Sequence, residues 1–414
     1  MSQCPYSTEA LSQGATFAQG RPLELMKEVR NHEAVSWHRD TRNDMGYWAV
    51  MRQKEIDYVS KNPLLFSSAA KGIAFQEIPE DMLELQRQNL ITMDPPNHLR
   101  YRRIVNAAFK PRYVEALHER FVDVFNDTLE PLLKKNHCEF VKEVSCELPL
   151  IAICEILGVP IEDRDMFFRC SNTLLGSDED EEIDEAQQAI SIAAQMELYG
   201  YADKVMEMAR DNLKDDIVGT LLTAEIDGHR LTDDEFRSFF FLLIVAGNET
   251  TRTATTHGMR LLMEHPVQYQ MLVDDPSLVE HAVEEILRFT APIQCMRRTA
   301  MEDTELAGQQ IKQGDKVVLF YQSSNHDESV FTDPEVFDIT RGLREEVRNA
   351  HRSFGVGEHF CLGSHLARLE LQVTFDGIVK HIRNPRLSRE PEWVKSNFIN
   401  SIREMNIEYD LAES

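Results

Sequence analysis

The order of apolar and polar residues changes its period along the chain. Residues 33–37 and 47–51 alternate between the two types, and residues 316–321 form an apolar run after the turn at Gly314. Both patterns are typical of strands. By contrast, residues 96–264 carry the helical period almost throughout. The chain is therefore predicted to be mainly α with a small β-rich portion.

One long helix is predicted to begin at Thr232, because Thr232 and Glu235 have the spacing of a capping box. Pro266 ends it, since proline cannot continue a helix. About 30 residues at ~1.5 Å each make a rod of roughly 45 Å, enough to cross the whole molecule. Further helices are predicted over residues 277–289 and from near Cys361 to residue 379.

No feature of the sequence marks a domain boundary. The 414 residues are 42% hydrophobic, with scattered glycine and proline, no low-complexity tract and no repeat. A chain of this length buries roughly three quarters of its unfolded surface. We expect a single domain over residues 1–414.

Charge and cysteine content exclude several classes of partner and location. Lys and Arg number 44 against 70 Asp and Glu, and the net charge of −26 argues against nucleic-acid or anionic-membrane partners. The N-terminus lacks a signal-like sequence, and the longest apolar run, residues 239–247, is far shorter than the roughly 20 residues that cross a bilayer. Seven cysteines without paired spacing fit a reducing compartment. We expect a cytoplasmic protein without membrane insertion.

The strongest candidate for chemistry is Cys361, in the sequence Phe-Gly-Val-Gly-Glu-His-Phe-Cys-Leu-Gly at residues 354–363. Its glycines bend the loop just before a predicted helix and let backbone approach a flat cofactor closely. An axial thiolate in such a loop suits haem iron. Two alternatives are a small buried hydrophobic cysteine and a zinc site. The zinc site would draw on His351, His359 and His365. The spacing favours haem, because zinc sites usually offer paired ligands.

Four more motifs accompany this loop in a fixed order: residues 98–102, 246–251, 285–288 and 334–337. Together with the cysteine loop, they resemble the motifs of a cytochrome P-450, a haem-thiolate monooxygenase, from about residue 20 to the C-terminus. The resemblance implies haem b (iron protoporphyrin IX) and the cytochrome P-450 fold, a triangular prism with a long central helix over the haem.

The resemblance also implies roles for individual residues. Cys361 would be the iron ligand, Glu249 and Thr250 would deliver protons, and Glu285 and Arg288 would be structural. The residues expected to contact the haem are His98, Arg102, Ala246, Gly247, Arg298, Phe354, Gly355, His359, Cys361 and Gly363. Among these, the donors to the two propionates are His98, Arg102, Arg298 and His359.

The substrate is expected to lie among mostly apolar segments that the resemblance selects. These are residues 67–90, a lid at 172–185, residues 245–246, 292–296 and 396–400. The expected lining residues are Ile73, Phe75, Ile78, Val245, Ala246, Ile293, Phe398 and Ile399. An apolar lining predicts a small hydrophobic substrate.

Residues 140–150, 231–236, 245–252 and 310–321 are similar to steroid side-chain 26-monooxygenases and methyl-branched lipid ω-hydroxylases. This similarity implies hydroxylation of an unactivated C–H bond of a steroid side chain, isoprenoid or branched lipid. O2 would be the oxidant, and a ferredoxin with its NAD(P)H-dependent reductase would supply two electrons. The alternatives are a peroxide-dependent peroxygenase, against which the acid-alcohol pair argues, and a non-enzymatic haem or zinc protein.

A basic run precedes the cysteine loop. Its members are Arg341, Arg344, Arg348 and Arg352, and Lys110 and Arg112 follow the first motif. Such a run can be a docking patch for an acidic ferredoxin, or equally a solvated or salt-bridged cluster.

Overall fold

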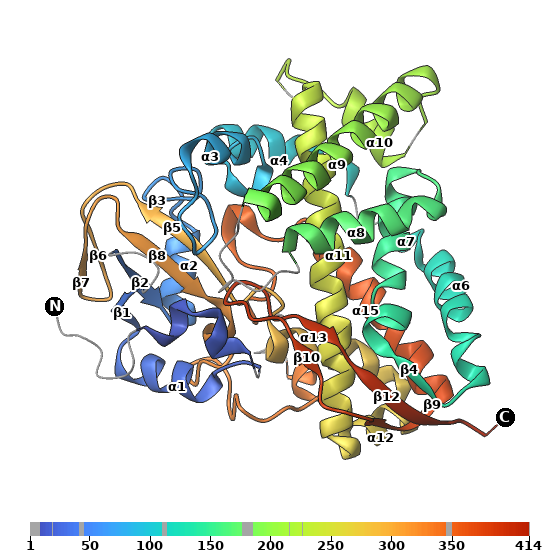
Figure 1. Cartoon of the computed structure of the whole chain (residues 1–414). Coiled ribbons are helices and arrows are strands. Elements are labelled where there is room, and N and C mark those ends of the chain that lie inside the picture. Colours follow the sequence, from blue (N-terminus) through green and yellow to red (C-terminus); the bar gives the residue numbers. More distant parts are fainter. Residues whose placement is uncertain are drawn as a thin grey trace.

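The computed structural model describes residues 9–18, 20–40, 45–109, 114–175, 185–214, 216–225, 227–344 and 350–413. A large helical part holds the last described residues of the chain, and a smaller β-rich part holds the first (Figure 1). The helices are α1 Leu23–His32, α2 Gln53–Ser60, α3 Glu80–Gln86, α4 Asn97–Ala108, α6 His118–Leu129, α7 Glu147–Leu157, α8 Arg164–Leu175, α9 Glu185–Asp211, α10 Ile217–Thr223, α11 Asp233–Glu264, α12 Pro266–Asp274, α13 Val279–Thr290, α14 Tyr321–Ser324 and α15 Ser364–His381.

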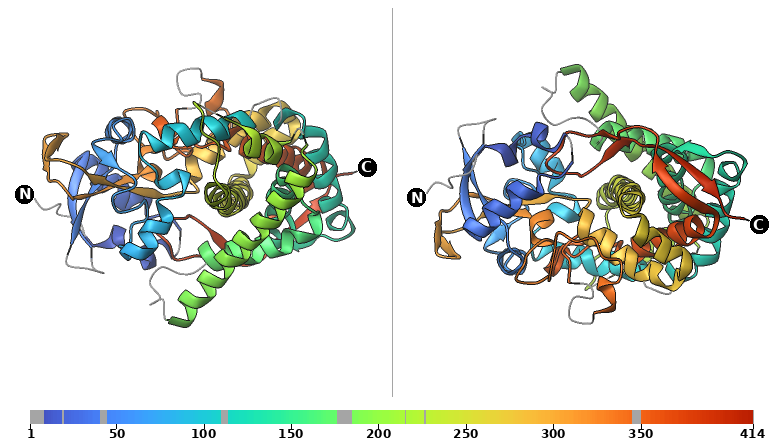
Figure 2. Two further views of the ribbon diagram at one scale, coloured as in Figure 1. Left: turned by 90° about the horizontal axis from the view of Figure 1, so that it is seen from above. Right: turned by 90° about the horizontal axis from the view of Figure 1, so that it is seen from below.

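Helix α11 is the predicted long helix. The Thr232 hydroxyl accepts from the Glu235 backbone N–H at 3.1 Å, and the Glu235 carboxylate accepts from the Thr232 backbone N–H at 2.9 Å. The predicted capping box is therefore confirmed. The helix ends at Glu264, and Pro266 opens α12. Seen along its axis, α11 runs through the middle of the molecule, with other elements around it (Figure 2).

The β-rich part is built on one mixed sheet of order β1-β2-β8-β5-β3. Strands β2 and β8 are parallel, and the other neighbours are antiparallel. The bounds of these strands are β1 Val35–Arg39, β2 Gly46–Val50, β3 Phe66–Ser67, β5 Cys295–Ala300 and β8 Lys316–Phe320. All three predicted strands are confirmed in this sheet, although Tyr321 starts α14 instead of ending β8.

Smaller sheets complete the fold. A three-stranded sheet of order β4-β12-β9 lies on the helical side. The remaining strands are β4 His137–Glu139, β6 Thr304–Leu306, β7 Gln309–Ile311, β9 Ile382–Leu387, β10 Glu392–Trp393, β11 Ile402–Glu404 and β12 Asn406–Leu411. Strand β4 interrupts the stretch that is predicted to be helical from 96 to 264. It forms by pairing with β12, which lies more than 260 residues later in the chain, so the local sequence pattern does not predict it.

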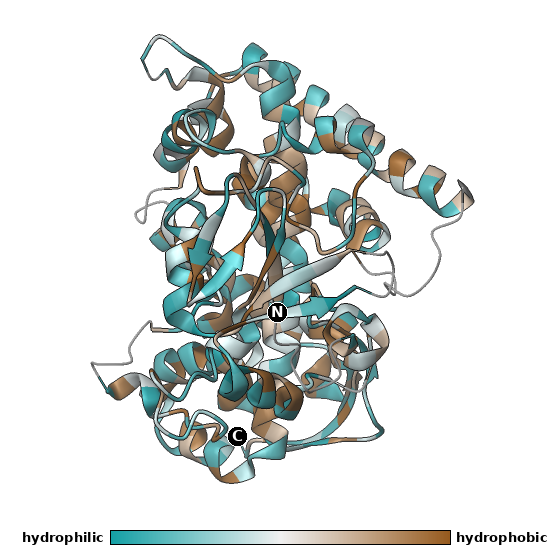
Figure 3. Ribbon diagram, turned by 90° about the vertical axis from the view of Figure 1, so that its left-hand side faces the viewer, coloured by the Kyte–Doolittle hydropathy of each residue, from teal (hydrophilic) through white to brown (hydrophobic). Residues whose placement is uncertain are grey.

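Burial follows the two periods that the sequence shows. One large hydrophobic core gathers the helices around α11, and two smaller cores lie on opposite faces of the mixed sheet. In β8, Val318 and Phe320 enter one small core, whereas Val317 and Leu319 enter the other. Figure 3 shows hydrophobic residues along α11 and polar residues on many outer elements. In the described part of the chain, every helix is too short or too polar to span a bilayer.

Candidate active site

The loop before α15 owes its shape to glycine. Gly355 and Gly357 have φ angles of +69° and +78°, which side chains other than glycine rarely adopt. A Cβ at Gly357 would also lie 2.7 Å from the Ser60 carbonyl oxygen of α2. The Cys361 N–H donates to the Phe354 carbonyl at 2.9 Å, and this bond closes the loop. The loop therefore fixes the place of the Cys361 thiol.

Cys361 differs from the other cysteines in its accessibility. Of the six cysteines that the structure describes, five are buried and Cys361 alone is partly exposed. Burial raises the pKa of the Cys361 thiol, while the Gly363 N–H, Arg102 and Arg368 act in the opposite direction. Positive charge and an N–H group beside sulfur favour the thiolate, which is the form that binds a metal.

Two histidine rings lie beside this loop. The rings of His98, on α4, and His359 are 4.2 Å apart. Both ring nitrogens of His98 and Nε2 of His359 are buried without a hydrogen-bond partner. Burial, followed by the charge of Arg102, lowers the pKa of His98 to about 4. Burial, followed by the charge of Arg298, lowers the pKa of His359 to about 2. Buried polar groups normally have partners, so these rings are suited to a ligand.

Two arginines complete the donor set. Arg298 of β5 is buried, its Nη1 donates to the Arg297 carbonyl at 2.7 Å, and it forms no ion pair with any residue that the structure describes. Arg102 lies four residues after His98 on α4 and donates to the Phe360 carbonyl at 2.6 Å. A buried cation without a counter-ion is costly, so an anion is expected here. Two guanidinium groups and two imidazoles fit the two propionates of haem.

One face of α11 is accessible near the middle of the helix. Ala246 is exposed there and Val245, Gly247 and Thr250 are partly exposed, whereas every residue from 251 to 262 is buried. The Thr250 hydroxyl donates to the Ala246 carbonyl at 2.7 Å. This back-bond is usual for threonine inside a helix. The exposed face of α11 is apolar apart from this hydroxyl.

Glu249 does not share that face. It is fully buried, accepts from the Ser401 hydroxyl at 2.7 Å and forms an ion pair with Arg252. Arg252 in turn donates to the Asn172 side-chain oxygen at 2.7 Å. Sequence reasoning placed Asn172 in the lid and did not connect it, Arg252 or Ser401 with Glu249. Only Arg252 left a local signal, because a residue three positions after Glu249 lies on the same helix face.

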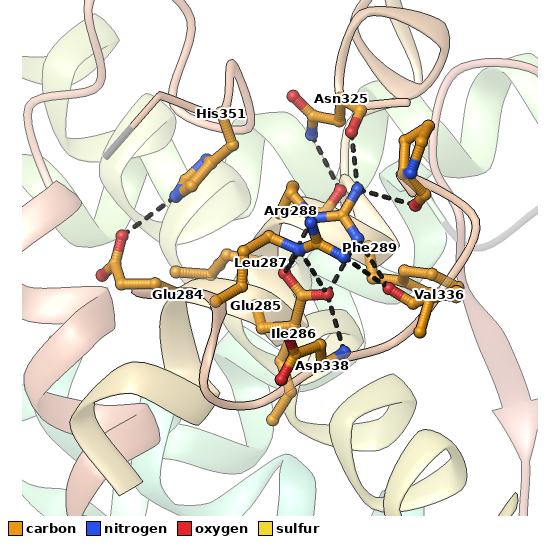
Figure 4. Close-up of polar contacts among 12 residues, drawn as sticks. Glu284, Glu285, Ile286, Leu287, Arg288, Phe289, Asn325, Val336, Asp338 and His351 are labelled. Atoms are coloured by element: carbon orange, nitrogen blue, oxygen red, sulfur yellow. Dashed lines mark hydrogen bonds and ion pairs between the residues drawn. The ribbon is translucent and has the colours of Figure 1, made fainter. Parts of the chain in front are cut away.

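Glu285 is the centre of a buried network (Figure 4). Its carboxylate accepts from Arg288 at 2.7 and 2.8 Å, from the Asp338 backbone N–H at 3.0 Å and from Arg341 at 3.1 and 3.2 Å. Arg288 also donates to the Asn325 carbonyl at 2.7 Å. The network joins α13 to the segment that precedes the cysteine loop. These contacts agree with the structural role expected of Glu285 and Arg288.

Arg341 corrects the expectation of a surface arginine run. It is 4% exposed, and it donates to the carbonyls of Thr332 and Val336 at 2.7 and 2.8 Å as well as to Glu285. It is therefore part of the interior. A single sequence cannot reveal this, because Glu285 lies 56 residues away.

The other arginines of the run that the structure describes form ion pairs. Arg352 donates to both oxygens of Asp57 at 2.6 and 2.9 Å, and Arg344 donates to Asp338 at 3.0 Å. Arg348, Lys110 and Arg112 lie outside the described residues. The salt-bridged alternative thus fits Arg344 and Arg352.

Most of the expected pocket residues lie on segments that backbone contacts hold together. Ile293 pairs with Ile399 in an isolated antiparallel bridge, and the Gln294 N–H donates to the Phe398 carbonyl at 2.8 Å. Ile73 is bonded to β5, which follows Gln294 in the chain, because the Ile73 carbonyl accepts from the Arg297 N–H at 2.8 Å. The side chain of Ile78 lies next to Gly72 in the same loop.

Phe75 is placed elsewhere. Its ring is 1% exposed and meets Tyr47 edge-on, with ring centres 4.7 Å apart, inside one of the small cores beside the sheet. The expected lid is described only up to residue 175 and again from 185, so most of it lies outside the described residues.

The histidines near Cys361 do not assemble a metal site. The His351 Nε2 lies 3.0 Å from Glu284, and His359 stacks on His98. Within the described ranges, no three His, Cys, Asp or Glu side chains converge as metal ligands. The zinc alternative therefore has no support in this part of the chain.

Sequence comparison identifies the family. Residues 183–384 match the model described as cytochrome P-450. The chain is 38% identical over 405 residues to a steroid C26-monooxygenase of Rhodococcus jostii, across 96% of this chain and 83% of that protein. The chain belongs to the cytochrome P-450 family. This P-450 is also 36% identical over 367 residues to a methyl-branched lipid omega-hydroxylase of Mycobacterium tuberculosis, across 87% and 84% of the two chains.

The fold agrees with the family. A cytochrome P-450 of Mycobacterium marinum, solved in complex with pseudoionone, superposes with a TM-score of 0.84 at 34% identity, covering 93% of this chain and 94% of that one. The expected cytochrome P-450 fold is confirmed. The protein is an oxidoreductase, a haem b monooxygenase.

Proposed function

We propose that this P-450 hydroxylates an unactivated C–H bond in the branched end of a hydrophobic molecule, such as a steroid side chain, an isoprenoid or a branched lipid. One atom of O2 enters the product as hydroxyl and the other leaves as water, with two protons and two electrons. A ferredoxin and its NAD(P)H-dependent reductase supply the electrons.

The names of the similar proteins support this substrate class. They include a steroid C26-monooxygenase, a methyl-branched lipid omega-hydroxylase and a protein solved with pseudoionone. The accessible residues expected to line the site agree with an apolar ligand, since Val245, Ala246, Ile293 and Phe398 are all apolar and only partly or not at all buried.

In this proposal Cys361 would ligate the iron, while His98, Arg102, Arg298 and His359 would bind the propionates. A haem held by this thiolate would supply the activation of O2. Gly355 and Gly363 would let the loop approach the haem, and Phe354 would form an apolar wall beside the sulfur. The Arg368 guanidinium stacks on that ring, 4.5 Å from its centre.

Proton delivery falls to two neighbours on α11. Thr250 presents its hydroxyl to the substrate space and can exchange its bond to the Ala246 carbonyl for one to water. Glu249 faces the other way, toward Ser401 and Arg252. Glu249 receives a proton through its buried contacts with Ser401 and Arg252. Water then carries this proton around the helix to the Thr250 hydroxyl.

The single observation that carries the haem site is the convergence of Arg102, Arg298 and the unbonded ring nitrogens of His98 and His359 beside the loop of Cys361, the one partly exposed cysteine among those that the structure describes. The test is Cys361→Ser, with Cys138→Ala as the matched control in a buried cysteine far from this loop. The reduced, CO-bound spectrum of the wild type and of Cys138→Ala should show the red-shifted band of thiolate ligation. In Cys361→Ser that band and the hydroxylation should be lost, and an unchanged spectrum would end the assignment.

Substrate class is tested by the spin-state change of the haem on titration. A steroid with a branched side chain, an isoprenoid and a methyl-branched fatty acid should each be compared with a straight-chain fatty acid of equal carbon number. We expect the branched compounds to shift the spectrum at lower concentration. A stronger response to the straight chain would contradict the branched-substrate proposal.

A further inference from the structure

The segment that joins β3 to α3, residues 68–79, is fastened to the molecule at several points. We call it the β3–α3 loop. At its start, the Ser68 N–H donates to Asp94 at 2.9 Å and Arg87 donates to the Ala69 carbonyl at 3.0 Å. In its middle, the Ile73 carbonyl accepts from the Arg297 N–H at 2.8 Å. Its far end is held by charge.

Two buried cations lie under that far end. The side chains of Arg297 on β5 and Lys316 on β8 are 1% and 0% exposed. The Glu77 Oε1 atom lies 2.8 Å from Arg297 Nη1 and 2.9 Å from Lys316 Nζ. Lys316 also contacts Asp40 at 3.1 Å and donates to the Phe75 carbonyl at 3.0 Å. Two cations therefore share two carboxylates, and one of these carboxylates is on the loop.

The two sides of this cluster differ in their freedom to move. Both cations are fixed in strands of the mixed sheet, whereas the side chain of Glu77 is 37% exposed and within reach of water. Burial raises the pKa of Glu77, but its bonds to Lys316 and Arg297 outweigh this effect and hold the pKa below its usual range. If Glu77 moves away, Asp40 is the one carboxylate left beside the two buried cations among the residues that the structure describes, which is unfavourable. The loop is thus drawn toward the sheet.

The cluster also adjoins the haem donors. Arg297 and Arg298 are consecutive on β5, so their side chains point to opposite faces of the sheet. Arg298 belongs to the donor set without a counter-ion, and Arg297 holds the loop through its N–H and its guanidinium. Ile73 and Ile78 of the loop are both only partly buried. One strand therefore positions both the donor and the loop.

We propose that Glu77 is a latch: its ion pairs with Arg297 and Lys316 keep the β3–α3 loop closed over the substrate space, and their release lets bulky molecules enter and leave. The inference rests on the proposed function, in which this loop walls the site. Glu77 does not touch the reacting atoms and is a positioning residue.

The test compares Glu77→Gln with Glu130→Gln in the haem-loaded protein. Glu130 is the control, because it is an exposed glutamate just after α6, on the helical side of the molecule, that pairs with Lys134 at 2.7 Å. Stopped-flow absorbance should follow the binding and release of econazole, a bulky azole, and of imidazole, a small one. In Glu77→Gln we expect both econazole rates to rise roughly tenfold, the size typical of losing one charge-assisted hydrogen bond. Imidazole rates should stay unchanged, and Glu130→Gln should match the wild type.

Hydrogen exchange provides a readout that does not depend on catalysis. Amides of residues 68–79 and the Arg297 amide should exchange faster in Glu77→Gln than in Glu130→Gln, while β1 and β2 should exchange at wild-type rates. Glu77→Asp, which keeps the charge, should recover part of the protection. Unchanged exchange and unchanged econazole rates would overturn the latch. Loss of the proposed haem-thiolate function would instead appear in the CO-bound spectrum, whatever the exchange result.

Discussion

Two adjacent residues of α11 have opposite surroundings. Thr250 is partly exposed on the face where Ala246 is uncovered, and Glu249 is fully buried against Ser401. Residues i and i+1 of a helix do not face each other. Any proton exchange between this acid and this alcohol must therefore pass around the helix. The acid would act as a reservoir behind the helix, and the alcohol would act at the site.

Thr250→Ala tests the alcohol. The apolar walls stay intact, so we expect substrate to bind within about twofold of wild type, whereas product formed per NADH consumed should fall steeply, at most by the roughly 10²- to 10⁴-fold that proton-transfer catalysis contributes. The missing electrons should appear as hydrogen peroxide. Thr255→Ala is the matched control, because Thr255 makes the same back-bond, to the Thr251 carbonyl at 2.9 Å, but is buried. Full coupling in Thr250→Ala would remove its assigned role.

At the scale of elements, the Glu285 network decides how the cysteine loop is held. Arg288 and Arg341 come from α13 and from the segment before the loop, and both bind the one carboxylate. Arg341 also occupies three backbone carbonyls, of Thr332, Asp333 and Val336. Because the guanidinium fork makes all these bonds at once, an ammonium group cannot replace it.

Arg341→Lys should therefore destabilise the protein strongly. We expect a loss of about 3–5 kcal/mol in the free energy of unfolding, the size found when a buried charge loses its partner. Denaturant unfolding of the haem-loaded protein measures this loss. Arg344→Lys is the control: Arg344 is 46% exposed and pairs with Asp338, so its change should cost under about 1 kcal/mol. Equal losses in both variants would place Arg341 among ordinary surface residues.

Helix α15 carries a buried glutamate, Glu370, that makes the stability of the protein depend on pH. Glu370 is 3% exposed, its Oε2 atom has no hydrogen-bond partner, and burial raises its pKa from 4.5 to about 8. The folded protein therefore keeps a proton that the unfolded chain releases between these two pH values. The contribution of Glu370 to the free energy of unfolding is fully present below about pH 4.5 and is lost as the pH rises toward 8.

Glu370→Gln should remove that pH dependence. Across this window, the difference in unfolding free energy between variant and wild type should grow in favour of the variant, with a slope of up to about 1.4 kcal/mol per pH unit. Chemical denaturation at five pH values measures it. The exposed Glu392→Gln should show no such trend. Parallel curves for Glu370→Gln and wild type would mean that the carboxyl is ionised in the folded state.

Sequence reasoning succeeded where the signal is local. Thr232, Glu235 and Pro266 set the ends of α11, and the glycines before Cys361 set the loop. It failed where the partner is distant. The burial of Arg341 depends on Glu285, and the place of Phe75 depends on Tyr47, and neither partner is recognisable in a single sequence. The π-helix over Val141–Ser145 also left no pattern that could be distinguished from an ordinary helix.

For the molecule as a whole, charge bears on electron supply. The net charge of −26 repels an acidic ferredoxin at long range. The arginine run is the feature that would reverse this locally, but of its three described members Arg341 is interior and Arg344 and Arg352 are paired with Asp338 and Asp57. The field that an approaching partner meets is therefore set more by the whole surface than by this run.

The salt dependence of haem reduction distinguishes repulsion by the whole acidic surface from steering by the arginine run. If an acidic ferredoxin is the donor and meets a repulsive field, its association rate should rise or stay level between about 0.05 and 0.5 M salt, because screening shortens the Debye length below ~10 Å. Stopped-flow reduction of the substrate-bound haem measures this rate. Arg344→Glu should change it by less than about twofold, like the control Arg386→Glu, whose arginine lies on β9 and pairs with Glu408. A rate that falls tenfold with salt, and falls again in Arg344→Glu alone, would instead show that Arg344 leaves Asp338 to steer the partner.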